Sequence, residues 1–190
     1  MKFLRLFKKI KINTDRVLGL SAMLVSFLSL IFFIYQTNIM RDQSRLSVKP
    51  RLVFNTNVIT NDSVVTFNFS LQNKGLGPAI IKEARIVHES NVFPLDFDFF
   101  VEYNFPKLEN FGSLLTTTRL NDESIISVDE IQDLLVFSAN VKDIEKINEY
   151  LKLNQGDYLL PWDVKITYES LYEEEWKLNY QKIKNTIVKK

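Results

Sequence analysis

A single histidine, His88, limits the catalytic chemistry that this chain can carry out. A Ser-His-Asp arrangement must use this residue as its base. A zinc site must combine it with carboxylates alone, because cysteine is absent. His88 ends a β-rich run and has Glu89 beside it. An isolated histidine in such a place is most often a surface or edge residue, so we expect no catalytic role for it.

The remaining candidates for site chemistry are carboxylates. Asp96 and Asp98 share a face if their segment is extended, and calcium sites or glycosidase pairs can have this spacing. Solvated acidic positions beside aromatic residues are the commoner explanation. The acidic run at residues 173–175 fits a soluble turn better than a site for a cation or a basic partner. We predict no catalytic, cofactor-binding or metal-binding residues and no enzymatic activity.

The charge balance argues against nucleic acid as a partner. The 190 residues include 24 Lys and Arg against 23 Asp and Glu, so the chain as a whole has no strong positive field. Basic residues interleaved with aromatic ones occur only in residues 1–16, where a membrane explains them better. The lack of cysteine excludes disulfides and fits either side of a bacterial membrane.

The chain begins with an element that must organise the rest, an uncharged run at residues 17–35 (VLGLSAMLVSFLSLIFFIY). As a helix it reaches roughly 28 Å at about 1.5 Å per residue, close to the roughly 30 Å hydrocarbon core of a bilayer. The run is longer than a usual signal-peptide core, and no small-x-small cleavage site follows it. We predict an uncleaved signal anchor that crosses the membrane once, over residues 17–40.

The charges beside the span predict its orientation. Basic residues are more numerous before the span than after it: Lys2, Arg5, Lys8, Lys9, Lys11 and Arg16 precede it, and Arg41, Arg45 and Lys49 follow it. The positive-inside rule favours a cytoplasmic N-terminus and an extracytoplasmic C-terminal domain, anchored in the inner (cytoplasmic) membrane of a bacterium. The basic segment, residues 1–16, either sets this topology alone or forms a short helix in the headgroup region.

Residues 41–50 predict a juxtamembrane connector, and residues 51–190 predict a domain built mostly of strands. In residues 65–72 apolar and polar side chains alternate without a break, which is typical of an antiparallel sheet with one dry face. Further strands are expected at residues 52–58, 79–88, 114–120, 124–128 and 134–137. Residues 73–78 (NKGLGP) must turn, and their two glycines suit positive φ or close backbone approach.

A phenylalanine-rich segment interrupts the strands between residues 91 and 115. Pro94 could start a short helix there, and Pro106 must end or kink it. The segment either covers an open end of the core or presents aromatic side chains to a partner or ligand. In the second case we expect the partner-binding residues to be Phe97, Phe99, Phe100 and Phe105.

The C-terminal part predicts one helix and one hairpin. Asn140 can cap a helix whose apolar stripe includes Ile144 and Ile147 and whose end precedes Gly156. Residues 164–168 and 176–180 alternate as the two strands of a hairpin. The whole pattern predicts a mainly β chain: a single transmembrane helix followed by an immunoglobulin-like β-sandwich, residues 51–190, with one or two helical insertions. A small barrel is the alternative.

Three short motifs carry a family resemblance: residues 47–50 (SVKP), 71–81 (LQNKGLGPAII) and 166–172 (ITYESLY). In these motifs the chain resembles bacterial single-pass membrane proteins, mostly uncharacterised. Residues 73–79 are similar to the strand and turn of CARDB-type immunoglobulin-like domains. The resemblance implies an adhesion or assembly module without catalytic residues. Glu173 stands where such proteins often have glycine, so the final turn is expected to differ.

The leading interpretation is a membrane-anchored, non-enzymatic interaction or assembly module. Its partners are then the lipid bilayer and a protein partner or homo-oligomer, with no cofactor and no nucleic acid. Exposed strand edges and the phenylalanine-rich segment are its natural docking surfaces. The alternative is a membrane-acting effector of a bacterial antiviral defence system, whose β domain senses or oligomerises. Hydrolysis of an envelope sugar or lipid by Asp96 and Asp98 is a third possibility.

Overall fold

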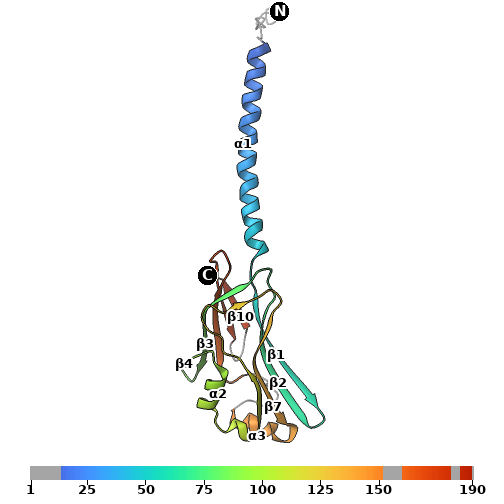
Figure 1. The fold of residues 1–190 in the computed structure, drawn as a ribbon, viewed down its shortest axis with the longest axis vertical. Helices are drawn as coiled ribbons and strands as arrows, with labels where there is room; N and C mark the ends of the chain where they lie inside the picture. Colours follow the sequence, from blue (N-terminus) through green and yellow to red (C-terminus); the bar gives the residue numbers. More distant parts are fainter. Residues whose placement is uncertain (1–13, 152–159, 181–184, 190) are drawn as a thin grey trace, which may run out of the picture. The chain divides into compact units, whose positions relative to one another are not determined.

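The structure, a computed structural model, describes residues 14–151, 160–180 and 185–189, the last of these by their backbone alone. The chain divides into two compact units, Met1–Arg45 and Leu46–Lys190. The first contains most of one long helix, and the second contains the strands (Figure 1).

The long helix α1 spans Thr14–Ser47, 34 residues in all. Its most apolar 18-residue window has a mean hydropathy of 2.5, so it is long and apolar enough to cross a membrane, as predicted. The hydroxyls of Ser21, Ser26 and Thr37 donate to carbonyls three or four residues earlier, which satisfies them within the helix. Residues 41–47, which lie within the expected juxtamembrane connector, continue the helix, since neither proline nor glycine interrupts them.

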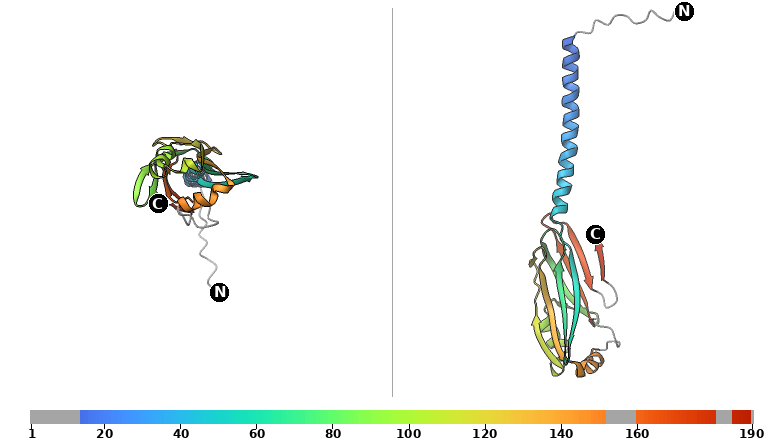
Figure 2. Two further views of the ribbon diagram at one scale, coloured as in Figure 1. Left: turned by 90° about the horizontal axis from the view of Figure 1, so that it is seen from below. Right: turned by 90° about the vertical axis from the view of Figure 1, so that its right-hand side faces the viewer.

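The second unit contains two antiparallel sheets (Figures 1 and 2). The first sheet has the order β1-β2-β7-β5, with bounds Leu52–Asn61, Val64–Asn73, Ile131–Asn140 and Gly112–Thr117. The second has the order β10-β9-β8-β3-β4, with bounds Asn185–Lys189, Glu175–Tyr180, Asp163–Glu169, Ala79–His88 and Asn91–Pro94. The two-residue strand β6 (Ile125–Ile126) also pairs with β3.

The order of strands is that of an immunoglobulin-like sandwich. When the strands are lettered in chain order, β1, β2, β7 and β5, which are neighbours across one sheet, correspond to strands A, B, E and D. Strands β3, β8 and β9 correspond to C, F and G of the other. The expected hairpin is present as β8 and β9, with Ile166 opposite Leu178 and Tyr168 opposite Trp176. The predicted fold class is therefore confirmed.

Two helical insertions interrupt the strands. Helix α2 (Phe97–Asn104) follows β4, and the 3-10 turn η1 (Leu108–Asn110) precedes β5. Pro94 lies in β4 and does not start the helix. Asp96 caps the start of α2, where its side chain accepts the N–H of Phe99. The 3-10 turn η2 (Val141–Asp143) and helix α3 (Ile144–Tyr150) follow β7, with Asn140 as the cap of η2. Gly156 lies outside the described residues.

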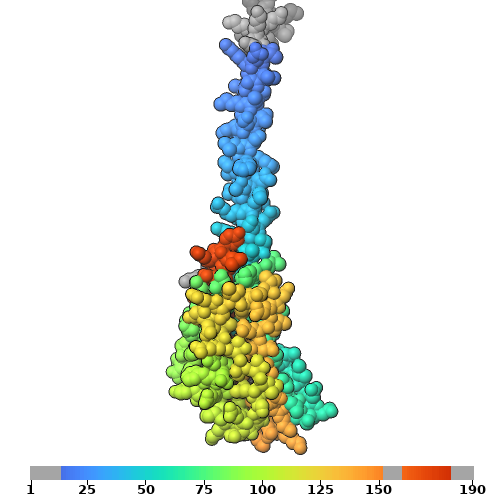
Figure 3. Space-filling view, in the orientation of Figure 1, coloured from blue at the N-terminus to red at the C-terminus, as the bar shows by residue number. Residues whose placement is uncertain are grey.

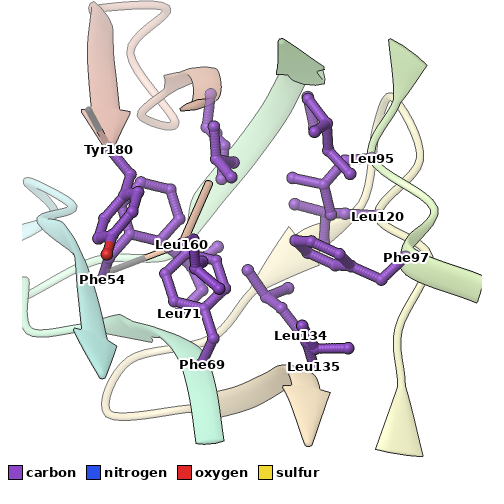
Figure 4. Packing of buried hydrophobic residues seen from close by; sticks show 14 of the residues in the cluster. Phe54, Phe69, Leu71, Leu95, Phe97, Leu120, Leu134, Leu135, Leu160 and Tyr180 are labelled. Atoms are coloured by element: carbon purple, nitrogen blue, oxygen red, sulfur yellow. The ribbon is translucent and has the colours of Figure 1, made fainter. Parts of the chain in front are cut away.

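The core lies between the inward faces of the two sheets. The alternation in β2 buries Phe69 and Leu71 completely, and Phe54 of β1 stacks on Phe69 at 5.2 Å between ring centroids. Tyr180 of β9 meets Phe69 from the opposite sheet at 5.1 Å. Figure 4 shows these rings together with Leu134 and Leu135 of β7 and Phe97 of α2. Burial of alternate side chains from both sheets thus stabilises the sandwich.

Candidate functional site

The phenylalanine-rich segment belongs to the core. Phe97 and Phe100 are fully buried and Phe105 is 8% exposed, whereas Phe99 is 49% exposed. Phe100 and Phe105 lie 5.0 and 5.5 Å from the ring of the buried Trp162, measured between centroids. Three of the four side chains expected at a partner surface therefore do not lie on the surface. Because residues 97, 100 and 101 share one face of α2, that face turns inward and Phe99 turns outward.

The outward face of α2 carries a small aromatic pair. The rings of Phe99 and Tyr103 stack at 5.9 Å with 21° between their planes, and Tyr103 is 68% exposed. Phe93 of β4 contacts Tyr103 at the same centroid distance. Two exposed rings are ordinary on a soluble surface, so this pair by itself indicates no particular partner.

Of the polar candidates from the sequence, Asp96 and His88 have structural partners. The Asp96 carboxylate caps α2 and lies 3.8 Å from the Arg119 guanidinium, while Asp98 lies in the first turn of the helix. They are therefore not paired on an extended strand. His88 packs its ring against Phe100 and Phe105. Among the described residues, no three His, Cys, Asp or Glu side chains are grouped as a metal site requires.

One buried polar residue that the sequence did not single out organises an end of the sandwich. Asn73, the last residue of β2, is fully buried. Its side-chain oxygen accepts the N–H groups of Arg51 and Gly75, and its amide nitrogen donates to the carbonyls of Gly77 and Ile126. The side chain thus ties the start of β1, the β2–β3 loop and β6 together. Asparagine two residues before glycine is a signal for such a side-chain turn.

The two glycines of this loop allow close backbone approach. A Cβ on Gly77 would lie 2.0 Å from the carbonyl oxygen of Val48, and one on Gly75 would lie 2.3 Å from the Arg51 nitrogen. The loop also pairs with the incoming chain, since Leu76 N–H donates to the Lys49 carbonyl at 2.8 Å. The expectation of close approach at residues 73–78 is confirmed, and the loop fixes where the chain enters the domain.

A hollow of about 100 Å³ opens beside α3. Its walls are almost entirely apolar and include Phe67, Phe137, Ile147 and Trp162. The indole nitrogen of Trp162 is buried, and no other described residue accepts its N–H. An apolar hollow without charged groups can hold apolar atoms but offers no acid, base or nucleophile for catalysis.

The four edges of the two sheets differ in how well they are protected from pairing. Strand β4 is only four residues long and ends in Pro94, and β5 has a register shift between Leu114 and Thr116. Strand β10 has five residues and ends at Lys189. Natural edge strands are blunted in these ways: by shortness, by proline, by bulges and by lysine.

The edge of β1 has none of these protections. Its sequence, LVFNTNVITN, is ten residues long and contains no charge and no proline. Its pairing with β2 runs from Leu52 opposite Asn73 to Asn61 opposite Val64 without a register shift. The far end of the β1–β2 hairpin stands out from the surface of the second unit, as the teal segment in Figure 3 shows. β1 is thus the long, unbulged edge of the described sheets.

The hydrogen bonds at the start of β1 determine which backbone groups face this edge. Lys74 N–H donates to the Arg51 carbonyl, so the backbone groups of Arg51 point toward β2. Because the direction of these groups alternates along a strand, the N–H and C=O groups of the odd-numbered residues 53–61 also point toward β2. The N–H and C=O groups of Phe54, Thr56, Val58 and Thr60 therefore point away from β2. No hydrogen bond joins these groups to another described residue. These groups form a row of hydrogen-bond donors and acceptors with which the backbone of one further strand can pair.

Comparisons with known proteins assign neither a family nor a function to the chain. No protein-family model matches the chain, and no curated protein matches it.

Proposed function

We propose that the chain is a membrane-anchored, non-enzymatic interaction module whose docking element is the free edge of β1. The observation that carries this proposal is the row of backbone groups that pair with no other described residue, on a long, uncharged and unbulged edge strand. Sheet edges of this kind bind an added strand through main-chain hydrogen bonds, with alternate side chains providing specificity. The long apolar helix α1 supports the membrane anchor.

A photo-crosslinking experiment tests this assignment in living cells. A genetically encoded benzophenone residue in place of Thr56 lies on the edge of β1, and the same residue in place of Thr116 lies on the bulged edge of β5. Both threonines are exposed. The Thr56 variant should form a defined protein adduct on irradiation, and the Thr116 variant should not. Absence of an adduct at Thr56, or equal adducts at both positions, would overturn the proposal.

We further propose that α1 is a signal anchor in the inner membrane of a bacterium, with the β-sandwich outside the cytoplasm. The excess of basic residues before the span supports this orientation. An alkaline phosphatase reporter fused after Lys190 should then be active, because this enzyme needs the oxidising compartment to form its disulfides. An inactive phosphatase fusion, together with a fluorescent cytoplasmic reporter at the same position, would reverse the orientation.

A further inference from the structure

We infer that the strand that pairs with β1 is the β1 strand of a second copy of this chain, antiparallel and centred on Thr56. The inference rests on the proposed function, because it names the partner of the same edge. It follows from two properties of residues 52–60: the direction of their free backbone groups and the near-palindromic order of their side chains.

The backbone groups on the edge of β1 can pair when two copies of the strand are related by a two-fold axis at Thr56. With Thr56 opposite its own copy, Phe54 lies opposite Val58, and Leu52 lies opposite Thr60. All of these residues have even numbers, so their backbone N–H and C=O groups point away from β2. Residues that lie opposite each other can therefore exchange backbone hydrogen bonds between the two copies. The N–H of Leu52 is already used, since it hydrogen-bonds to Tyr168, but its carbonyl is free to accept from Thr60 of the second copy.

The side chains match on both faces of the joined sheet. On the core side Phe54 meets Val58 and Thr56 meets Thr56. On the outer side Val53 meets Ile59 and Asn55 meets Asn57. In the central seven residues, 53–59, apolar residues thus face apolar ones, amides face amides, and a hydroxyl faces its copy, which are favourable cross-strand pairs; only the outer pair, Leu52 and Thr60, is mixed.

Neighbouring registers lose this match. A pairing centred on Asn57 also uses the free backbone groups, but it sets Asn55 against Ile59 and Val53 against Asn61. A pairing centred on Asn55 sets Val53 against Asn57 and Phe54 against Thr56. Each places polar side chains against apolar ones, so the register is specified by the chemistry of the strand.

Charge supports the same partner. A charged residue near a two-fold axis meets its own copy, and β1 has no charged residue at all. The nearest charges on either side are Arg51 before the strand and Asp62 after it. In the register centred on Thr56, Arg51 lies opposite Asn61 of the other copy and next to its Asp62. No two like charges are therefore opposed in this register.

Disulfide trapping tests this arrangement cleanly, because the chain contains no cysteine of its own. In the full-length chain in detergent micelles, Thr56→Cys places the two introduced residues opposite each other, with Cα atoms about 5.5 Å apart. This distance lies within the range that a disulfide spans. Thr60→Cys, on the same edge, places them about 26 Å apart along the strands, at about 3.3 Å per residue.

With a mild oxidant, Thr56→Cys should form a covalent dimer of twice the 22.3 kDa chain mass, and Thr60→Cys should remain a monomer. In the chain without an introduced cysteine, Val58→Pro should raise the dissociation constant of the non-covalent dimer, measured by analytical ultracentrifugation, about tenfold or more, because each copy loses an edge N–H. The fold should persist, since this N–H does not bond to β2. If the proline variant fails to fold, Thr56→Lys, in the chain without an introduced cysteine, should weaken the non-covalent dimer in the same measurement, because it places two like charges on the axis.

The inference is overturned if Thr56→Cys stays monomeric, or if Thr60→Cys forms a disulfide equally well. The photo-crosslinking experiment separates this failure from failure of the proposed function. An adduct at Thr56 of twice the chain mass supports self-pairing. An adduct of any other mass keeps the edge as a docking element but excludes a second copy as its partner.

Discussion

The side-chain oxygen of Asn73 accepts the backbone N–H of Arg51 at 3.1 Å, across 22 residues of sequence. This bond joins the end of β2 to the residue that precedes β1. The same side chain makes three further hydrogen bonds, to Gly75, Gly77 and Ile126, so a fully buried amide has all its groups satisfied. The side chain of Asn73, together with the backbone contacts of the β2–β3 loop, therefore fixes where the chain enters the sandwich.

Replacing this amide should weaken the domain strongly. Asn73→Ala leaves two N–H groups and two carbonyls without their partner, and we expect a loss of about 3 kcal/mol or more in unfolding free energy. Urea unfolding followed by tryptophan fluorescence measures it, since the chain has two tryptophans. Asn68→Ala is the matched control: Asn68 is half-buried and donates only to Asp133, so its loss should be below about 1 kcal/mol. Equal losses would contradict the role given to Asn73.

The close approach at Gly77 predicts a second loss of stability. Gly77→Ala places a methyl group 2.0 Å from the Val48 carbonyl oxygen, which is backbone and cannot rotate away. We expect about 2 kcal/mol or more of destabilisation in the same urea assay. Gly19→Ala in α1 has no atom within 4 Å of the added carbon, so it should leave the unfolding midpoint unchanged. A neutral Gly77→Ala would show that the loop can move away from residue 48.

Burial in the phenylalanine-rich segment predicts opposite outcomes for neighbouring residues. Phe100→Ala empties a fully buried site beside Trp162 and should cost about 3–5 kcal/mol. Phe99→Ala removes a half-exposed ring and should cost less than about 1 kcal/mol. Unfolding curves of the two variants, compared with the unmodified chain, measure the difference. Similar costs would mean that α2 does not close the core as the structure has it.

Alkaline pH should destabilise the sandwich through Tyr168. Burial raises the pKa of its phenol above the ordinary value of 10.0, although the Leu52 hydrogen bond and the nearby Arg51 charge lower it in part. The folded state therefore holds this proton more tightly than the unfolded state. The corresponding stability is complete below pH 10 and is lost as pH rises through the folded-state pKa.

Tyr168→Phe should flatten this alkaline decline in urea unfolding measured between pH 8 and about pH 11. Lys82 acts in the same range, because its hydrogen bond and ion pair with Glu169 raise the pKa of its ammonium group. Lys82 is exposed, so Lys82→Gln should flatten the decline much less than Tyr168→Phe. A larger effect from Lys82→Gln would place the pH dependence on the surface ion pair.

Membrane retention should depend on the apolar part of α1. Leu24→Lys and Leu28→Lys each place a charge within the span, at a cost of about 2.5–3.5 kcal/mol near the centre of a bilayer. The double variant should leave the membrane pellet and enter the soluble fraction. Leu46→Lys, in the polar end of the same helix, should stay in the pellet. Retention of the double variant would show that something other than this span holds the chain to the membrane.

The sequence alone determined the elements that depend on local chemistry. The uncharged run of residues 17–35 requires a helix long enough for a bilayer, whatever follows it. Alternation in residues 65–72 predicts one buried and one exposed face; Phe69 and Leu71 are buried as expected, but Ser70 between them is buried too, and Thr66, Asn68 and Gln72 are only partly exposed. The turn at residues 73–78 and the hairpin of β8 and β9 follow from glycine, proline and alternation in the same way.

The tertiary structure decided what depends on residues far apart in the chain. The sequence could not say whether the phenylalanine face of α2 turns inward, because the rings of Phe69 and Trp162 that receive it lie elsewhere in the chain. Nor could the sequence show that β1 is an edge strand. β1 has β2 as its only neighbour in the described sheet because β7, which lies far along the chain, pairs with the other edge of β2. Periodicity tells which face of a strand is dry, but only long-range pairing tells which edge is free.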